Sequence, residues 1–117
     1  MESEEIRIVL KTEEFNSYFV SLDLQIREKY DYVIQLIKTQ KIVSEKFIKK
    51  IQNTELYEVR VSVNANEYRT MLITMDKPNF MEATKVVLLN SFLKKDKKQY
   101  KREIAKARTI IEKEDIL

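Results

Sequence analysis

The sequence predicts one α+β domain over residues 1–117, with a mostly antiparallel central sheet, and three observations support this prediction. The length of 117 residues is typical of one domain and suffices to bury a core. Hydrophobic residues make up 44% of the chain and charged residues 35%, which is the balance of a globular protein. The apolar spacing changes from helical to alternating and back to helical, which indicates helices, a meander of strands and a final helix. We expect the helices to pack on one face of the sheet.

The first elements along the chain are a short strand and a helix start. Residues 6–10 alternate loosely and are typical of a strand that ends near Thr12. Thr12 can cap a helix, and Glu13 and Glu14 directly after it place negative charge in the first turn, where the helix dipole favours it. A helix is therefore expected from about Glu13.

A helical stripe of apolar side chains follows. Its members recur at spacings of three and four: Phe15, Phe19, Leu22, Ile26, Tyr30, Val33 and Ile37. The stripe fits one long helix, and it fits two helices equally well, because Asp23 can cap a second one. Helical spacing continues in a further short piece that ends around Asn53 and carries Ser44, Phe47, Ile48 and Ile51.

The apolar period then changes to two, which predicts a hairpin. Residues 56–63 alternate between an apolar face and a polar face, and residues 68–75 form the next strand. Asn64–Asn66 lies between them and is expected to turn, because asparagine tolerates left-handed conformations in a chain without glycine.

The last two elements are a strand and a basic helix. Residues 85–92 form the third strand of the meander, and the continuous apolar run Val86–Leu89 indicates that this strand is central. From Asp96 to about Lys113 a helix is expected to flank the sheet, with an apolar stripe formed by Tyr100, Ile104, Ala107 and Ile111.

The composition excludes several kinds of site. Without cysteine or histidine, the chain has no disulfide, no thiolate zinc site, no HExxH motif and no Ser-His-Asp triad. Without glycine, it has no Gly-rich phosphate loop and no dinucleotide fingerprint. Uncharged runs reach only eight residues, so no membrane span is expected, and the acidic start does not resemble a signal peptide. We therefore expect a cytoplasmic protein.

Positive charge is concentrated near the C-terminus. Residues 94–108 carry eight Lys and Arg side chains against Asp96 and Glu103, although the net charge of the whole chain is only +3. Such an asymmetry favours a polyanionic partner at the basic end, although a solvated helix face explains the same segment.

Three cations are candidates for chemistry. Arg60 lies on the polar face of the first hairpin strand, where it either faces solvent, paired with Glu58, or binds a phosphate. Arg69 shares a face with apolar residues and needs an anionic partner, either a carboxylate or a phosphate. Lys94 follows the central strand. In a meander the three converge on one sheet face, where fixed cations stabilise developing phosphate charge.

The ordered motifs resemble the phage-derived, HigB-like branch of the RelE/ParE toxin superfamily. The residues that carry the resemblance are Leu56-Tyr57-Glu58-Val59-Arg60, Tyr68-Arg69, Val87 to Lys95, and Lys101 to Ala107. It is good over residues 54–112 and compatible over 1–53, as a strand and a helical hairpin. Asn90 departs from the pattern, because it stands where the branch commonly has histidine. Glu58 stands where RelE itself has lysine, but glutamate is ordinary at this position in the HigB-like branch and therefore favours that branch.

The resemblance implies the small RelE fold and the toxin of a toxin–antitoxin pair that cuts messenger RNA on the ribosome, inhibiting translation without metal or other cofactor. The implied catalytic residues are Arg60, Arg69, Lys94, Lys95 and Tyr100. The implied contacts to RNA and the ribosome are Lys97, Lys98, Lys101, Arg102 and Lys106. The implied protein partner is a cognate antitoxin of the helix-turn-helix type. Two alternatives stay open: a ParE-like toxin that binds DNA gyrase without cutting RNA, and a degenerate homologue that binds only its antitoxin.

Overall fold

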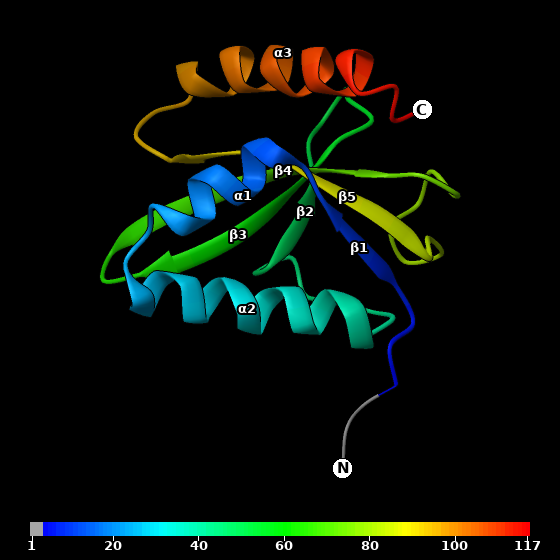
Figure 1. Cartoon of the computed structure of the whole chain (residues 1–117), viewed down its shortest axis with the longest axis horizontal. Helices are drawn as coiled ribbons and strands as arrows, with labels where there is room; N and C mark the ends of the chain where they lie inside the picture. Colours follow the sequence, from blue (N-terminus) through cyan, green and yellow to red (C-terminus); the bar gives the residue numbers. More distant parts are fainter. Residues whose placement is uncertain (1–3) are drawn as a thin grey trace.

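The computed structural model describes residues 4–117, and Figure 1 shows the arrangement of its elements. Over this range the elements are, in chain order, β1 (Ile8–Lys11), α1 (Glu13–Val20), α2 (Leu24–Thr39), β2 (Ile48–Lys50), β3 (Tyr57–Val63), β4 (Asn66–Thr74), β5 (Lys85–Leu93) and α3 (Lys98–Lys113). The predicted α+β class, with an N-terminal helical hairpin and a basic C-terminal helix, is confirmed.

The described strands form one sheet of order β1-β5-β4-β3-β2. β5 pairs with β1 in parallel and with β4 antiparallel, so it lies inside the sheet, as the apolar run Val86–Leu89 predicted. The other pairs, β3 with β4 and β2 with β3, are antiparallel. The sheet is therefore mostly antiparallel, and its parallel pair joins the start of the chain to the last strand.

The long apolar stripe divides into two helices. The side chain of Thr12 accepts a hydrogen bond from the Phe15 amide and caps α1. α1 ends at Val20, and Asp23 occupies the N-cap position of α2, although its side chain makes no capping hydrogen bond. Both helices pack on one face of the sheet, over a core that contains Phe15, Tyr30, Val33, Ile37, Val59, Val61, Leu72 and Leu88.

The expectation that all helices cover one face is wrong, because α3 covers the opposite face (Figure 1). β4 and β5 carry apolar side chains on both faces of the sheet. Leu72 and Leu88 belong to the core under α2, whereas Met71 and Leu89 pack with Ala107 of α3. A sheet that is apolar on both faces needs a cover on both, and the apolar stripe of α3 provides the second one.

The predicted short helix between Ser44 and Asn53 is also wrong. Residues Ile48–Lys50 form edge strand β2 instead, with Ile48 paired to Val59. The preceding turn is also attached to β3, since the Arg60 amide donates a hydrogen bond to the carbonyl of Phe47 at 2.7 Å. Pairing with β3 therefore overrides an apolar spacing that is too short to distinguish a helix from a strand.

The turns adopt left-handed conformations without glycine. In the hairpin between β3 and β4, Asn64 and Ala65 have φ of 49° and 67°, which fits a two-residue loop in which both residues are left-handed. Asn53, before β3, has φ of 61°. The predicted turn is confirmed at Asn64 and Ala65, whereas Asn66 is already the first residue of β4. Alanine takes a position that asparagine or glycine would occupy more easily.

Arg7, directly before β1, joins three segments of the chain. It is only 2% exposed, and its guanidinium donates to main-chain carbonyls, among them those of Ile37 at 2.9 Å and Ala83 at 3.0 Å. The other carbonyl acceptors belong to Gln40, Lys41, Phe80 and Met81. The guanidinium also lies 4.1 Å from the centre of the Phe80 ring. Arg7 thereby fixes the start of β1 to the end of α2 and to the segment before β5.

Across residues 4–117, none of the helices has both the length and the apolar character needed to cross a membrane.

Candidate functional site

A cationic groove lies between edge strand β2 and the start of α3. Its cavity has a volume of about 490 Å³. Its lining residues come from four parts of the chain and are Lys49, Lys50, Ile51, Gln52, Glu58, Lys94, Lys97 and Tyr100. Lysines therefore stand on both walls, two from β2 and two from the segment before α3, with a carboxylate and a phenol between them.

Lys94, Lys97 and Tyr100 are the predicted site residues that line this groove. Lys94 directly follows β5, and its amide donates a hydrogen bond to the carbonyl of Glu67 at 2.7 Å. This bond extends the pairing of β4 with β5 by one residue and fixes the point where the chain leaves the sheet. The rigid strand end therefore holds the lysines in place.

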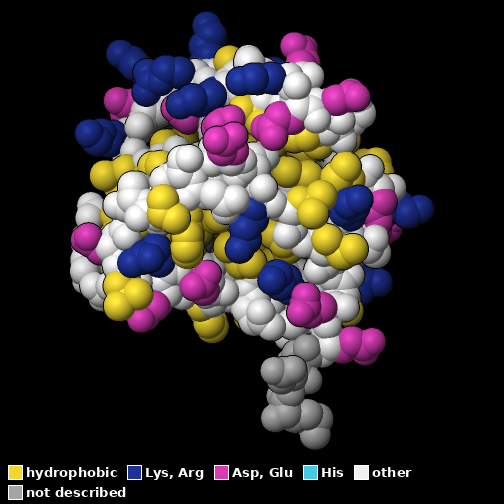
Figure 2. All heavy atoms as spheres, viewed as in Figure 1, with side chains coloured by type: hydrophobic (Ala, Val, Ile, Leu, Met, Phe, Trp, Pro, Cys, Tyr) yellow, Lys and Arg dark blue, Asp and Glu magenta, His cyan; other side chains and the backbone are white. Residues whose placement is uncertain are grey.

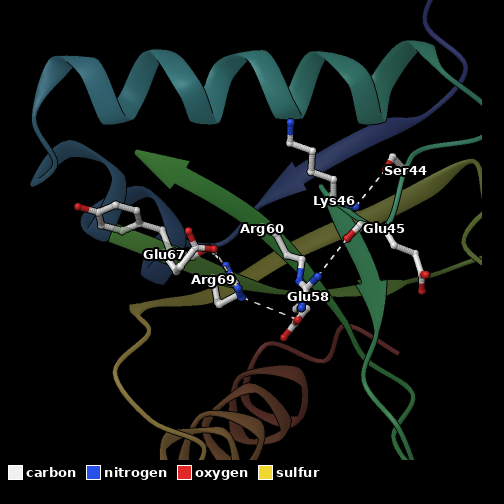
Figure 3. A network of polar contacts seen from close by, with 8 residues as sticks. Ser44, Glu45, Lys46, Glu58, Arg60, Glu67 and Arg69 are labelled. Carbon is white, nitrogen blue, oxygen red and sulfur yellow. Dashed lines mark hydrogen bonds and ion pairs between the residues drawn. The ribbon is translucent and has the colours of Figure 1, made fainter. Parts of the chain in front are cut away.

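Arg60 and Arg69 lie beside the groove and share Glu58, as Figure 3 shows. They are directly opposite each other on β3 and β4. The Nε of Arg60 donates to Glu58 Oε1 at 2.9 Å, and the Nε of Arg69 lies 3.8 Å from the same oxygen. Two cations at opposing positions would repel each other, and the shared carboxylate compensates for this.

Arg69 is buried, with 3% of its surface exposed, and does not line the groove. Its Nη2 donates to Glu67 at 3.3 Å, and its Nη1 donates to the carbonyl of Tyr68 at 3.0 Å. Its Nε has no hydrogen-bond partner among the described residues. The anionic partners that the sequence required are carboxylates, Glu58 and Glu67, in this structure.

Tyr100 lines the groove and neighbours Glu58 and Arg69, which we call the Arg69 cluster together with Arg60 and Glu67. Burial raises the pKa of Tyr100 to about 12, and the neighbouring Glu58 carboxylate adds to the effect. The ring packs edge-on against Phe92, with 5.5 Å between the ring centres. At neutral pH the phenol is therefore protonated, held by Phe92, and able to donate a proton or a hydrogen bond into the groove.

The remaining predicted cations lie outside the groove. Figure 2 shows Lys and Arg side chains gathered over the first part of α3. Five of the predicted cations are solvent-exposed. One lies in the linker before α3 and four lie on α3: Lys95, Lys98, Lys101, Arg102 and Lys106. They form a basic outer surface next to the groove rather than part of its lining.

Lys49, Lys50 and the position of Glu58 between two arginines are not predicted from the sequence. The short helix expected between Ser44 and Asn53 would not place the two lysines on the wall opposite Lys94. The signal that could have found them is their position directly before a strong alternating strand, where a preceding edge strand can pair. Glu58 is only 5% exposed and lies between two arginines on one sheet face, which makes it a candidate for the centre of the site.

Asn90 has a structural position. It is 2% exposed, and its Nδ2 donates to both the main-chain carbonyl and the Oε1 of Glu103 at 3.0 Å. It lies at an irregularity of the β4–β5 pairing, where Thr70 pairs with Ser91 and Leu72 with Leu88. A β-bulge of this kind redirects side chains, and here it turns Asn90 toward α3. Asn90 therefore fastens α3 to the sheet and does not line the groove.

The arrangement suits a phosphate-containing ligand. Lysines on two walls neutralise negative charge, a neutral phenol donates, and a buried carboxylate orients both Arg60 and Tyr100. Among residues 4–117, no group of three or more acidic side chains is placed to hold a metal ion.

One comparison with known proteins gives a match. The family model of the phage-derived Gp49-like proteins (DUF891) matches residues 17–112. No curated protein and no solved structure matches the chain. The matched range begins inside α1 and includes α2, for which the sequence motifs were only compatible, together with strands β2 to β5 and nearly all of α3. Since it covers most of the sequence, the chain belongs to the Gp49-like phage-derived proteins, a family associated with RelE- and HigB-type toxins.

Proposed function

We propose that this chain is the toxin of a toxin–antitoxin pair, of the HigB-like branch, and that it cuts messenger RNA on the ribosome in the cytoplasm without a metal ion. The observation that carries the proposal is the groove with lysines on both walls and Tyr100 beside Glu58. The family membership supports the toxin assignment. The ribosome and the RNA are inferred from the motif resemblance and from the basic surface of α3.

The proposed reaction uses the 2′-hydroxyl of the RNA as nucleophile. Its oxygen forms a bond to the adjacent phosphorus, the bond from phosphorus to the 5′-oxygen breaks, and a 2′,3′-cyclic phosphate results. Glu58 takes the proton of the 2′-hydroxyl, and Tyr100 gives a proton to the leaving 5′-oxygen. The proton then passes from Glu58 to Tyr100, which restores both groups. Positioned proton transfer of this kind contributes about 10²- to 10⁴-fold.

The cations have different proposed parts. Lys94, with Lys95 and Arg60 nearby, neutralises the charge that develops on the phosphate. Arg69 lies behind Glu58 and holds its carboxylate toward Tyr100. Lys97 and the exposed cations of α3 bind the flanking RNA and the ribosome in a sequence-independent way.

The experiment is cleavage of ribosome-bound messenger RNA in the presence of EDTA, with analysis of the product ends. The proposal expects a 2′,3′-cyclic phosphate and no cut where the 2′-hydroxyl is replaced by hydrogen. Lys94→Ala and Tyr100→Phe should each lower the rate by about 10²-fold, since each removes one charge-stabilising or proton-donating group. Lys77→Ala, an exposed lysine in the turn after β4, is the matched control and should cleave like the wild type.

Asn90 favours the degenerate, antitoxin-binding homologue as the second candidate. The side chain at this position fastens α3 and contributes no acid or base to the groove. If the folded protein leaves ribosome-bound RNA intact and does not slow growth, this second function replaces the first. Inhibition of gyrase supercoiling by a protein that cuts no RNA would instead support the ParE-like alternative.

A further inference from the structure

A second surface, away from the groove, combines exposed apolar side chains with lysines. It consists of Lys29 and Tyr32 on α2 together with Ile42, Lys46 and Phe47 from the segment before β2, and we call it the aromatic–lysine surface. A hollow of about 210 Å³ lies at its centre, between α2 and the 42–47 segment. Leu36 and Val43 complete its apolar floor.

Two large apolar side chains of this surface are exposed to solvent. Ile42 is 73% exposed and Tyr32 is 53% exposed, and the Tyr32 ring stands edge-on to Phe47 with 6.1 Å between ring centres. An apolar centre with an exposed tyrosine is the composition of a protein interface, where tyrosine often contributes strongly to affinity.

Lysines stand at the rim of this centre. The Nζ of Lys29 lies 5.3 Å from the centre of the Tyr32 ring, and the Nζ of Lys46 lies 5.5 Å from that of Phe47. Figure 3 shows the Lys46 side chain directed toward α2. The described residues that line the hollow include no carboxylate. An apolar centre with a cationic rim is complementary to an amphipathic segment that carries acidic residues beside its apolar stripe.

We propose that the aromatic–lysine surface is the docking site of the antitoxin partner, and that the partner places an acidic amphipathic helix on it. This inference rests on the proposed function, because it names where the partner of that toxin binds. We favour a helix over RNA, because Ile42 is 73% exposed and the apolar stripe of an amphipathic helix buries such a side chain, whereas RNA is recognised mainly through aromatic stacking and polar contacts.

The surface is joined to the groove through Arg60. The Arg60 amide donates to the carbonyl of Phe47 at 2.7 Å, and the Nη1 of Arg60 donates to the carbonyl of Glu45 at 3.3 Å. The same guanidinium binds Glu58 at 2.9 Å. A partner that moves the 45–47 turn therefore changes the position of Arg60, so that docking can suppress the reaction while the groove stays open.

The test uses the protein encoded by the adjacent gene as the probe, with its affinity for this full chain measured by titration calorimetry. Ile42→Glu and the double variant Lys29→Glu/Lys46→Glu should each weaken binding by at least about 30-fold, the scale of losing a central interface contact. Val20→Glu is the matched apolar control, since Val20 is 69% exposed, and Lys77→Glu is the charge control. Both controls should bind like the wild type, and thermal melts should show all variants folded.

The outcomes separate this inference from the proposed function. If the wild-type chain stops growth and the adjacent protein rescues it, but the surface variants bind as tightly as the controls, the docking site is wrong and the toxin assignment stands. If the chain is harmless, the toxin assignment fails, while the binding measurement still decides the docking site. The docking site would also be wrong if substitution of Tyr32 and Lys46 weakened the binding of a single-stranded RNA but left the affinity for the adjacent-gene protein unchanged.

Discussion

Arg7 and Arg69 are almost equally buried, with 2% and 3% of their surfaces exposed, but their partners belong to different chemical classes. The guanidinium of Arg7 donates to main-chain carbonyls of two separate segments, 37–41 and 80–83, and stacks on Phe80. The guanidinium of Arg69 meets the carboxylates of Glu58 and Glu67 and retains an Nε without a hydrogen bond among the described residues.

The two buried arginines therefore differ in what their partners can do. Main-chain carbonyls are fixed by the fold and carry no titratable charge, so the Arg7 cluster stabilises the connection of β1 to α2. Carboxylates titrate and can exchange partners, and Glu58 also serves Arg60 and neighbours Tyr100 in the groove. A buried ion pair contributes little net stability compared with an apolar replacement, and we therefore infer that Arg69 and Glu58 serve the proposed site rather than the stability of the fold.

The largest expected effect follows from removing Arg7. Arg7→Met should lower the free energy of unfolding by about 4 kcal/mol, because several buried carbonyls lose their donor at once. Arg7→Lys should recover less than half of this loss, since an ammonium has three donors and no planar fork. Urea titrations of the two variants measure the effect. If Arg7→Met lowers the free energy of unfolding by less than about 1 kcal/mol, water replaces the guanidinium, and the structural role given to Arg7 is wrong.

A somewhat smaller effect is expected at Glu58. Glu58→Gln leaves the buried Arg69 with Glu67 as its remaining carboxylate and should lower the free energy of unfolding by about 3 kcal/mol. Arg69→Met should behave similarly, because Glu58 then keeps only Arg60. The same urea titrations, with the double variant Glu58→Gln/Arg69→Met, give the coupling energy between the two residues. Additive losses would show that the two side chains do not act as a pair.

The smallest effect is the response to acid. The hydroxyl of Ser62 and the guanidinium of Arg69 lower the pKa of Glu67 below its ordinary value of 4.5. A carboxyl with a lowered folded-state pKa contributes stability above pH 4.5, and this contribution is lost as the pH falls through the folded pKa. Wild-type protein should therefore lose slightly more stability than Glu67→Gln on acidification, whereas Arg7→Lys should follow the wild-type slope, because its cluster does not titrate there. Thermal melts at a series of acidic pH values distinguish the slopes.

The sequence predicted the elements that have a strong period and failed where tertiary pairing decides. The alternating strands, the central β5 and the basic helix follow from apolar spacing alone. β2 could not be predicted from three residues, because its strand conformation depends on pairing with β3. Met71 and Leu89 alternate with Leu72 and Leu88, so the sequence contains apolar residues for both sheet faces. It does not show which helix covers the face of Met71 and Leu89.

The candidate site was predicted in part for a similar reason. The basic segment and the convergence of Arg60, Arg69 and Lys94 follow from a meander of strands. Sequence spacing does not show that Glu58 lies between the two arginines, nor that β2 brings Lys49 across from Lys94. Arg7 gave no signal at all, because its carbonyl partners belong to the backbone and have no side-chain signature.

The most direct test of this account is the rate of ribosome-dependent RNA cleavage by the double variant Glu58→Leu/Arg69→Met, measured per folded molecule. The account predicts a protein about as stable as the wild type, since apolar side chains replace a buried ion pair at little cost. It also predicts cleavage reduced by at least about 10²-fold, because the groove loses the carboxylate that orients Arg60 and Tyr100. A folded double variant that cleaves at the wild-type rate would contradict the assignment of the Arg69 cluster to the site.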